Sequence, residues 1–434
     1  MHLIKNFFID LSKDNLTNGF IAFLFAVTGP VAIMLLVGTK TQLTNQELSS
    51  WLFGAFAINS IISIIFTFWY KQPLVFMWSI PGIILIGSSI EHYTFNEIIG
   101  AYLVTGVLLI FLGFTNILVW INKQIPIEIV MGMVGAIFLQ FSLNWLFSIK
   151  ESPVLSGSMT IAYFLIYATP PIRKFLPPLL GSLSVGIIII LNSDSFDMLS
   201  KIEFIPISPT IFIPEFNLKA NIEIVIPLAI TVLFIQNGQG LAILKTAGHK
   251  TFLKPFTIAC GFGSIINSFF GTVSSCLTGP VTGIIVSEDQ NKNEANIKEA
   301  NNLIGKERTQ YLLKTYGQET VKAGIIEFKK KEIIKTHYTG AIIFSLLCII
   351  FGIFSPFFTG FITTCPPAFI STLGGIALLL VLKNTFIVAF SGSCSLGALI
   401  AFLITMSDLV FLNIGSPFWG LVSGVIITKM FDKK

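Results

Sequence analysis

Charge is scarce in this sequence. Asp, Glu, Lys and Arg make up 11% of the 434 residues, whereas a soluble domain carries about 25%. This scarcity excludes an ordinary soluble domain, and the small net charge of +5 gives no reason to expect a nucleic-acid partner. Hydrophobic residues instead make up 53% of the chain, with 42 Phe, so the expected surroundings are a lipid bilayer.

Residue types that serve catalysis and metal binding are also few. The five Cys lie in or beside apolar segments with no metal spacing and no paired pattern, and none of the four His falls in the middle of a span. We interpret the cysteines as small core residues. Because no nucleophile–base pattern is found either, we expect no enzyme, no catalytic residue, no metal and no cofactor.

Long apolar segments dominate the chain. A spanning helix needs about 20 apolar residues, and fourteen candidate segments follow one another, of which the third and the tenth are short and interrupted by Gly and Pro. The sequence therefore predicts an all-α polytopic membrane protein. The expected segments are 19–38, 50–69, 73–90, 98–121, 127–148, 154–170, 177–192, 222–244, 252–269, 272–287, 338–359, 365–382, 385–406 and 410–428.

The distribution of Lys and Arg predicts the orientation, because cytoplasmic loops of membrane proteins are enriched in these residues. With the N-terminus inside and fourteen crossings, four of the 27 basic residues fall outside: Lys40, Lys150, Lys201 and Lys219. We therefore expect a multi-pass protein of the inner (cell) membrane with both termini in the cytoplasm.

Two long loops divide the chain. Residues 193–221 are expected to form an external linker between a first repeat, 1–192, and a second repeat, 222–434, with seven spans each. Residues 288–337 are expected to form a cytoplasmic insertion within the second repeat. Apolar residues recur there at loosely helical spacing, so we expect amphipathic helices on the bundle or the membrane surface. A regulatory or partner-binding role is the alternative.

The two halves of the sequence share similar stretches. Residues 25–31 of the first span resemble 234–240 of the eighth, and the interrupted stretch 78–82 of the third span corresponds to 277–281 of the tenth. Because seven spans is an odd number, the second half must be inverted relative to the first. Inverted repeats are typical of secondary transporters, whose binding site lies at mid-membrane depth where the repeats meet.

Broken helices favour an anion site. Gly and Pro free backbone groups, which hydrocarbon tolerates only where they line a cavity or are buried in protein. The N-terminus of each half-helix carries partial positive charge and free N–H donors. Paired breaks in spans three and ten therefore predict a site for an anion, with packing kinks as the alternative interpretation.

Polar residues near these breaks are candidates for substrate contact. Gln236, Asn237 and Gln239 form the most polar cluster inside any span, and interhelical hydrogen bonding is the alternative interpretation for them. Ser275 and Thr278, near the break in span ten, are weaker candidates.

Acidic residues inside spans are rare. Asp408 lies between two spans with apolar sequence on both sides, and an intramembrane acid is a functional candidate by default. We favour a tight outer turn between the last two spans for this residue. The proton-coupling residue therefore stays unassigned.

Several stretches resemble the bacterial benzoate–proton symporter family. They occur in the same order over nearly the whole chain and include Trp-Ser-Ile-Pro-Gly at 78–82, Gln-Asn at 236–237 and Ala-Gly at 247–248. Near the C-terminus, Ile-Gly-Ser at 414–416 and Phe-Trp-Gly-Leu at 418–421 are similar to the closing motif of that family.

This resemblance implies a fold shared with the nucleobase–ascorbate and sulfate permeases, in which two inverted repeats of seven spans form a core domain and a gate domain. It also implies import of benzoate or a similar aromatic carboxylate with protons. Carried over by position, the implied site residues are Thr28, Trp78, Ser79, Gln236 and Asn237.

The sequence departs from the family in four places. Ile80 replaces a Thr, Gln239 replaces a Pro, the tenth span from Ser274 to Ile284 fits the family poorly, and the loop 288–337 is longer than the short loop of the family. The acidic residue that nucleobase relatives carry in span eight is also absent.

The favoured hypothesis is a secondary active transporter for proton-coupled import of benzoate or a similar small organic anion. A nucleobase or inorganic-anion transporter of the same fold is the first alternative. A non-transporting membrane sensor or a channel is the second, and ligand binding without flux would be its signature. The sequence leaves a homodimer open.

Overall fold

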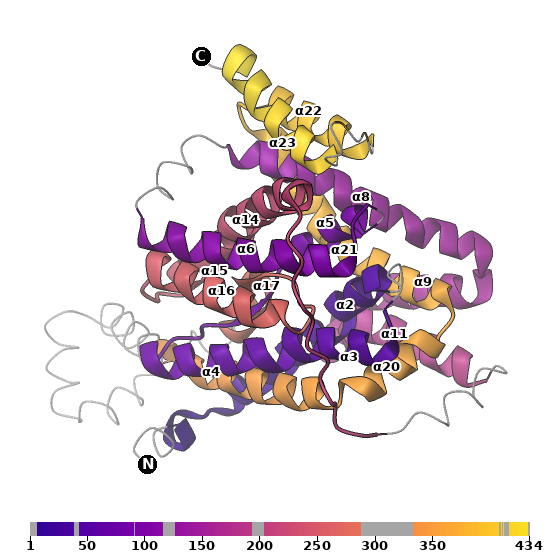
Figure 1. Ribbon diagram of the computed structural model, residues 1–434. Helices are drawn as coiled ribbons and strands as arrows, with labels where there is room; N and C mark the ends of the chain where they lie inside the picture. The colour runs from indigo at the N-terminus through magenta and orange to yellow at the C-terminus, as the bar shows by residue number, and fades with distance from the viewer. Residues whose placement is uncertain are drawn as a thin grey trace, which may run out of the picture.

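The computed structural model is built almost entirely of helices (Figure 1). It describes residues 7–38, 43–90, 92–115, 126–192, 204–287, 333–407, 409, 411 and 416–432. Asp408 and most of the expected insertion, residues 288–332, lie outside the described part of the chain.

The first half of the chain contains seven apolar segments. The first, fourth, fifth, sixth and seventh spans are single helices, the second is a helix with a π-helical turn, and the third begins with a short strand. Their bounds are α2 Lys13–Gly38, α3 Asn45–Phe53, η1 Gly54–Ile58, α4 Asn59–Tyr70, β1 Phe76–Trp78, α5 Ile80–Ser89, α6 Phe95–Phe114, α8 Ile127–Glu151, α9 Pro153–Ala168, α10 Pro170–Phe175 and α11 Pro178–Leu191.

The second half repeats this pattern, including a span that begins with a strand. Its elements are α13 Leu218–Ala220, η2 Asn221–Val225, α14 Ile226–Ile230, η3 Thr231–Gln236, α15 Asn237–Thr246, α16 Leu253–Ser268, β2 Ser275–Leu277, α17 Gly279–Ile285, the helix Ile333–Ile353, α20 Ser355–Thr364, α21 Pro367–Ser391, α22 Ser395–Met406, α23 Ser416–Ile427 and η5 Thr428–Asp432.

Seven helices in the described part of the chain are long and apolar enough to cross a membrane by length and composition, and four shorter apolar helices accompany them. Large apolar side chains are exposed along these helices, for example Trp69, Phe111 and Val154. In water such exposure would be unfavourable, so these surfaces suit a lipid environment. The prediction of an all-α polytopic membrane protein is confirmed.

One predicted boundary is wrong. The sequence places a loop between spans twelve and thirteen at Lys383, but α21 continues to Ser391 and the chain turns at Gly392, whose backbone is extended. A single Lys does not end an apolar helix, because its long side chain can lie along the apolar surface and carry its charge to the membrane interface.

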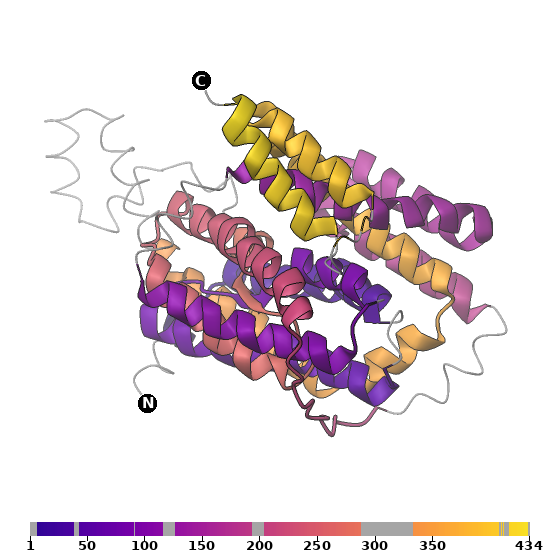
Figure 2. The ribbon, with the colours of Figure 1, turned by 45° about the horizontal axis from the view of Figure 1, so that its top comes forward.

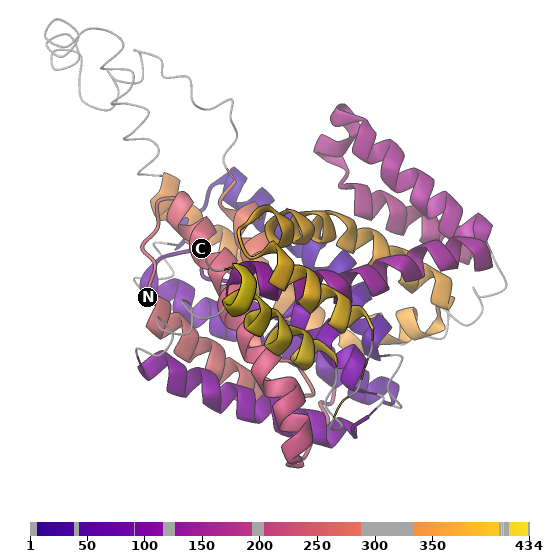
Figure 3. The same cartoon turned by 90° about the horizontal axis from the view of Figure 1, so that it is seen from above.

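The helices form two groups (Figure 2). One group is built from α8, α9, α21, α22 and α23; the other contains α6 packed against α16. Viewed from above, α9 and α11 lie at one edge of the molecule (Figure 3). The pair α8 and α21 occupies equivalent places in the two halves: each has 25 residues, and each follows a proline, Pro126 or Pro366.

Helix α2 joins these groups. It packs against α21 of the first group and also against both half-helices, α5 and α17. Any ligand held near the ends of α5 and α17 would therefore lie close to α2.

The two broken spans meet through their strands. β1 and β2 pair antiparallel, with Phe76 opposite Leu277, Met77 opposite Cys276 and Trp78 opposite Ser275. Both strands are buried. This pairing satisfies the backbone groups that the breaks release, which is the condition for irregular backbone inside a membrane protein.

Candidate functional site

The short ribbon of β1 and β2 carries a helix at each end. Trp78 is followed by Ser79, whose Oγ accepts a hydrogen bond from the Gly82 N–H at 3.1 Å and caps α5. Leu277 is followed by Thr278, the N-cap residue of α17. Because the strands are antiparallel, the two helices leave the ribbon in opposite directions with their N-terminal ends toward it.

The ribbon is extended by two more backbone bonds. The Ser79 N–H donates to the Ser274 carbonyl at 3.1 Å, and the Thr278 N–H donates to the Val75 carbonyl at 3.0 Å. The N-cap residues of both half-helices are thus fixed by the opposite strand. A displacement of one half-helix would be transmitted to the other.

Asn237 ties span eight to this ribbon. Its Oδ1 accepts from the Leu277 N–H at 2.7 Å and from the Cys260 Sγ at 3.5 Å, and the residue is 1% exposed. The amide group of Asn237 therefore lies against β2, where the sequence analysis expects a site residue.

Unpartnered polar atoms gather around the ribbon. Asn237 Nδ2, Trp78 Nε1 and Ser274 Oγ are buried and have no hydrogen-bond partner among the described residues. A buried donor without an acceptor costs about 1–3 kcal/mol, and such groups are rare in folded proteins. An acceptor-rich ligand bound here would satisfy them, so the ribbon is the best candidate for a polar binding site.

The other predicted residues lie around the ribbon in different roles. Ser275 donates its hydroxyl to Asn59 Oδ1 at 2.5 Å, so this hydroxyl is already engaged in holding β2. Gln236 is buried in η3, directly before Asn237. Gln239 is exposed and lies next to Gly279, since a Cβ added at Gly279 would be 2.8 Å from the Gln239 Cβ.

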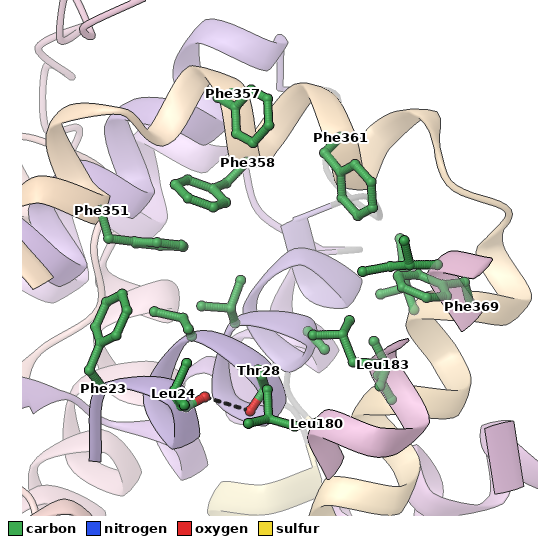
Figure 4. Close-up of a pocket in the computed structure, with 16 residues that line it drawn as sticks. Phe23, Leu24, Thr28, Leu180, Leu183, Phe351, Phe357, Phe358, Phe361 and Phe369 are labelled. Carbon is green, nitrogen blue, oxygen red and sulfur yellow. Dashed lines mark hydrogen bonds between the residues drawn. The ribbon is translucent and has the colours of Figure 1, made fainter. Parts of the chain in front are cut away.

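Thr28 contributes to a second feature, an apolar cavity of about 370 Å³ (Figure 4). The cavity lies between α2, α11, α20, α21 and the end of the helix Ile333–Ile353. Among the described residues that line it, Thr28 alone is polar, and its hydroxyl donates to the Leu24 carbonyl at 2.8 Å. Aromatic rings of Phe23, Phe351 and Phe358 line one side.

An aromatic chain links the cavity to the ribbon. The ring centroids of Trp78 and Phe56 are 4.5 Å apart. The ring centroids of Phe56 and Phe351, which lines the cavity, are 4.6 Å apart. This cavity was not predicted from the sequence, although Phe351, Phe354, Phe358 and Phe361 recur at helical spacing. That spacing predicts one aromatic helix face, but it does not show which spans lie opposite.

A buried acid was also missed. Glu223, which the sequence places at the start of span eight, is 2% exposed. It accepts hydrogen bonds from Ser89 Oγ at 2.8 Å and from Tyr93 Oη at 3.0 Å. No local pattern in the sequence signals this burial, because the two partners come from a distant part of the chain.

The described residues contain no group of three or more His, Cys, Asp and Glu side chains that could hold a metal ion. Two buried histidines do meet: His249 Nε2 and His337 Nδ1 are 3.1 Å apart. Burial lowers the pKa of His249 to about 4, so this ring is neutral near pH 7. The pair joins the loop after α15 to the start of the helix Ile333–Ile353.

A helical membrane bundle in which two interrupted spans meet at a short antiparallel ribbon has the architecture of the inverted-repeat secondary transporters. The family model for the benzoate membrane transport protein matches residues 9–305 and 320–430, and the chain belongs to this family. It is therefore a multi-pass membrane transporter. Within the expected insertion, the family model leaves residues 306–319 unmatched.

Two curated relatives match nearly the whole chain. The inner membrane protein YdcO of Escherichia coli is 24% identical over 428 residues, which cover 98% of each chain. The benzoate membrane transport protein of Acinetobacter baylyi is 24% identical over 432 residues, which cover 98% of this chain and 96% of the relative.

Among solved structures, that of SLC26A9 is similar in fold, with a TM-score of 0.61 at 15% sequence identity. The match covers 98% of this chain but 65% of the SLC26A9 chain. The predicted inverted-repeat fold is confirmed by this similarity.

Proposed function

We propose that this transporter imports benzoate or a similar small aromatic carboxylate together with protons. The observation that carries the proposal is the cluster of buried, unpartnered donors at the β1–β2 ribbon. The proposal is supported by membership of the benzoate membrane transport family and by the similarity to the Acinetobacter baylyi protein of that name.

The carboxylate would be held without a cationic side chain. No Lys or Arg occurs in residues 72–89 or 256–287, which include both broken spans. The available donors are Trp78 Nε1, Asn237 Nδ2 and the N-terminal N–H groups of α5. Donors of this kind can replace the water that an anion loses when it enters the bilayer core.

The aromatic ring of the substrate would be held by apolar walls. We place it toward Thr28 and the Phe-lined cavity, because the chain Trp78–Phe56–Phe351 joins this cavity to the ribbon. Aromatic rings favour offset or edge-to-face contacts worth about 0.5–1.5 kcal/mol beyond area burial. Gln236, Gln239, Ser79 and Thr278 would complete the surroundings, with Ser275 supporting β2.

The proposed topology places both termini in the cytoplasm. Near the first span, Tyr338 donates to Asp10 Oδ2 and Asn15 donates to Thr336, so the starts of spans one and eleven share one side. On the other side, the backbone N–H of Ile207 in the linker donates to the carbonyl of Ile353 at the end of span eleven. The insertion follows span ten and precedes span eleven, so we propose that it is on the side of the N-terminus. Its excess of Lys and Arg is what the cytoplasmic side requires.

The linker would therefore be external, and the repeats would comprise residues 1–192 and 222–434. The inner membrane is the proposed location, in agreement with the name of the Escherichia coli relative.

Binding of candidate ligands to the purified protein tests the proposed substrate. Benzoate should raise the melting temperature, since a ligand at 100 times its Kd stabilises the folded state by about 2.7 kcal/mol. Cyclohexanecarboxylate should do so less, because it keeps the carboxylate but loses the aromatic contacts. Benzamide, which has the ring without the charge, should have little effect.

Uracil and sulfate serve as probes of the alternatives. Stabilisation by uracil without stabilisation by benzoate would contradict the proposal and favour a nucleobase transporter. Stabilisation by sulfate alone would favour an inorganic anion. Benzoate binding without benzoate flux would favour a sensor or a channel.

A further inference from the structure

The strongest unassigned feature is the buried carboxyl of Glu223. It lies in the π-helical turn η2 of span eight and is 2% exposed. Two hydroxyl groups donate to it, Ser89 Oγ to Oε1 at 2.8 Å and Tyr93 Oη to Oε2 at 3.0 Å. Neither partner is a cation. An acid buried at membrane depth is expensive and is a functional candidate by default.

Ser89 connects Glu223 to the binding site. Ser89 is the last residue of α5, and Ser79 caps the other end of the same helix at the ribbon. With a rise of about 1.5 Å per residue, this ten-residue helix spans roughly 15 Å. The carboxyl of Glu223 thus holds one end of the half-helix whose other end faces the proposed anion site.

The ionisable groups around Glu223 are few. Tyr93 faces it directly; burial, followed by the charge and hydrogen bond of Glu223, raises the pKa of Tyr93, so the phenol stays protonated and keeps donating. Glu97 at the start of α6 lies near Tyr93, and its own carboxyl accepts from Asn217 Nδ2 at 2.6 Å.

The remaining packed elements contribute little charge. Helix α6 also carries Tyr102, and α13 carries Lys219, which is exposed. Helices α5, α14 and α23, which pack against η2, carry no ionisable side chain. Without a cation in contact, ionised Glu223 is a buried charge stabilised by two neutral donors, and binding of a proton removes that charge.

We propose that Glu223 is the proton-binding group that couples transport to the proton gradient. The inference rests on the proposed function. One carboxylate takes up one proton from the outer side, where its partner Tyr93 is half-buried, and releases it to the inner side after the transporter has changed conformation. A protonated carboxyl also has an O–H donor of its own, so its hydrogen bonds to Ser89 and Tyr93 rearrange. This rearrangement changes the hydrogen bond that holds the C-terminal end of α5.

The test is Glu223→Gln, which keeps one oxygen acceptor and puts an NH₂ donor in place of the other oxygen, as protonation puts an O–H there. In proteoliposomes, exchange of labelled for unlabelled benzoate at equal pH should continue. Accumulation driven by a pH gradient, which can reach about tenfold per pH unit for one proton per anion, should fall to no accumulation. The matched control is Glu97→Gln, an acid on the same side of the molecule, which should keep gradient-driven accumulation.

Retention of gradient-driven accumulation by Glu223→Gln would overturn the inference, and so would its loss in Glu97→Gln. Absence of benzoate exchange in the wild-type protein would instead contradict the proposed function. Even in that case, proton binding can be measured by infrared difference spectroscopy, which needs no substrate. A protonated-carboxyl band that titrates with pH in the wild type should be missing from Glu223→Gln, and its presence there would contradict the assignment.

Discussion

Asn237→Asp should weaken benzoate binding about a thousandfold at pH 8, because two unit charges 4 Å apart at an effective dielectric constant of 20 repel by about 4 kcal/mol. The substitution preserves shape and leaves an oxygen to accept from the Leu277 N–H. It replaces the unpartnered Nδ2 donor by a negative oxygen beside the proposed carboxylate. The Kd of benzoate should be measured by calorimetry on both proteins.

Asn192→Asp is the matched control. It makes the same amide-to-carboxylate change, but at an exposed side chain at the end of α11, outside the proposed site. Water screens the charge there, so the loss of affinity should be much smaller. If Asn237→Asp binds benzoate as well as the wild type does, the ligand is not an anion held at span eight, and a neutral substrate such as a nucleobase becomes the better hypothesis.

Asn59→Leu should prevent accumulation of folded protein. Asn59 Oδ1 accepts from Asn267 Nδ2 at 2.8 Å and from Ser275 Oγ at 2.5 Å, and these residues are fully buried. Leucine would leave two buried donors unpaired at about 1–3 kcal/mol each, a large share of the 5–15 kcal/mol typical of a native protein. Size-exclusion profiles and melting temperatures in detergent would show the loss.

Two variants separate this network from a general effect of replacing Asn. Asn192→Leu removes an exposed amide whose bond is local to α11, so the melting temperature should change little. Adding Ser275→Ala to Asn59→Leu removes one of the orphaned donors and should restore part of the stability. Equal destabilisation by Asn192→Leu would contradict the assigned role of Asn59.

The fold was predictable from sequence because the bilayer restricts the choices. Spanning segments must be helical and about 20 residues long, and breaks are tolerated only where they are buried in protein or line a cavity. The paired interruptions at 78–82 and 277–281 therefore identified the two spans that meet at the ribbon. The boundary at Lys383 failed because a snorkelling Lys resembles a loop residue in sequence.

The site was predictable only in part. Asn237 stands out as a polar residue beside a break, and the structure places its amide group against β2. The engagement of Ser275 with Asn59 and the burial of Glu223 by Ser89 depend on contacts between distant segments. Local patterns carry no information on such contacts. The Phe-lined cavity likewise required knowledge of which helices face α20.

Uptake of labelled benzoate into proteoliposomes under an inward proton gradient tests the central claim most directly. Neutral benzoic acid can cross a bilayer unaided, so protein-free liposomes and Asn237→Asp proteoliposomes must be measured in parallel, at a pH well above the carboxyl pKa. The account predicts accumulation above both controls that collapses when a protonophore dissipates the gradient. Uptake equal to that of the controls, or uptake indifferent to the proton gradient, would contradict it.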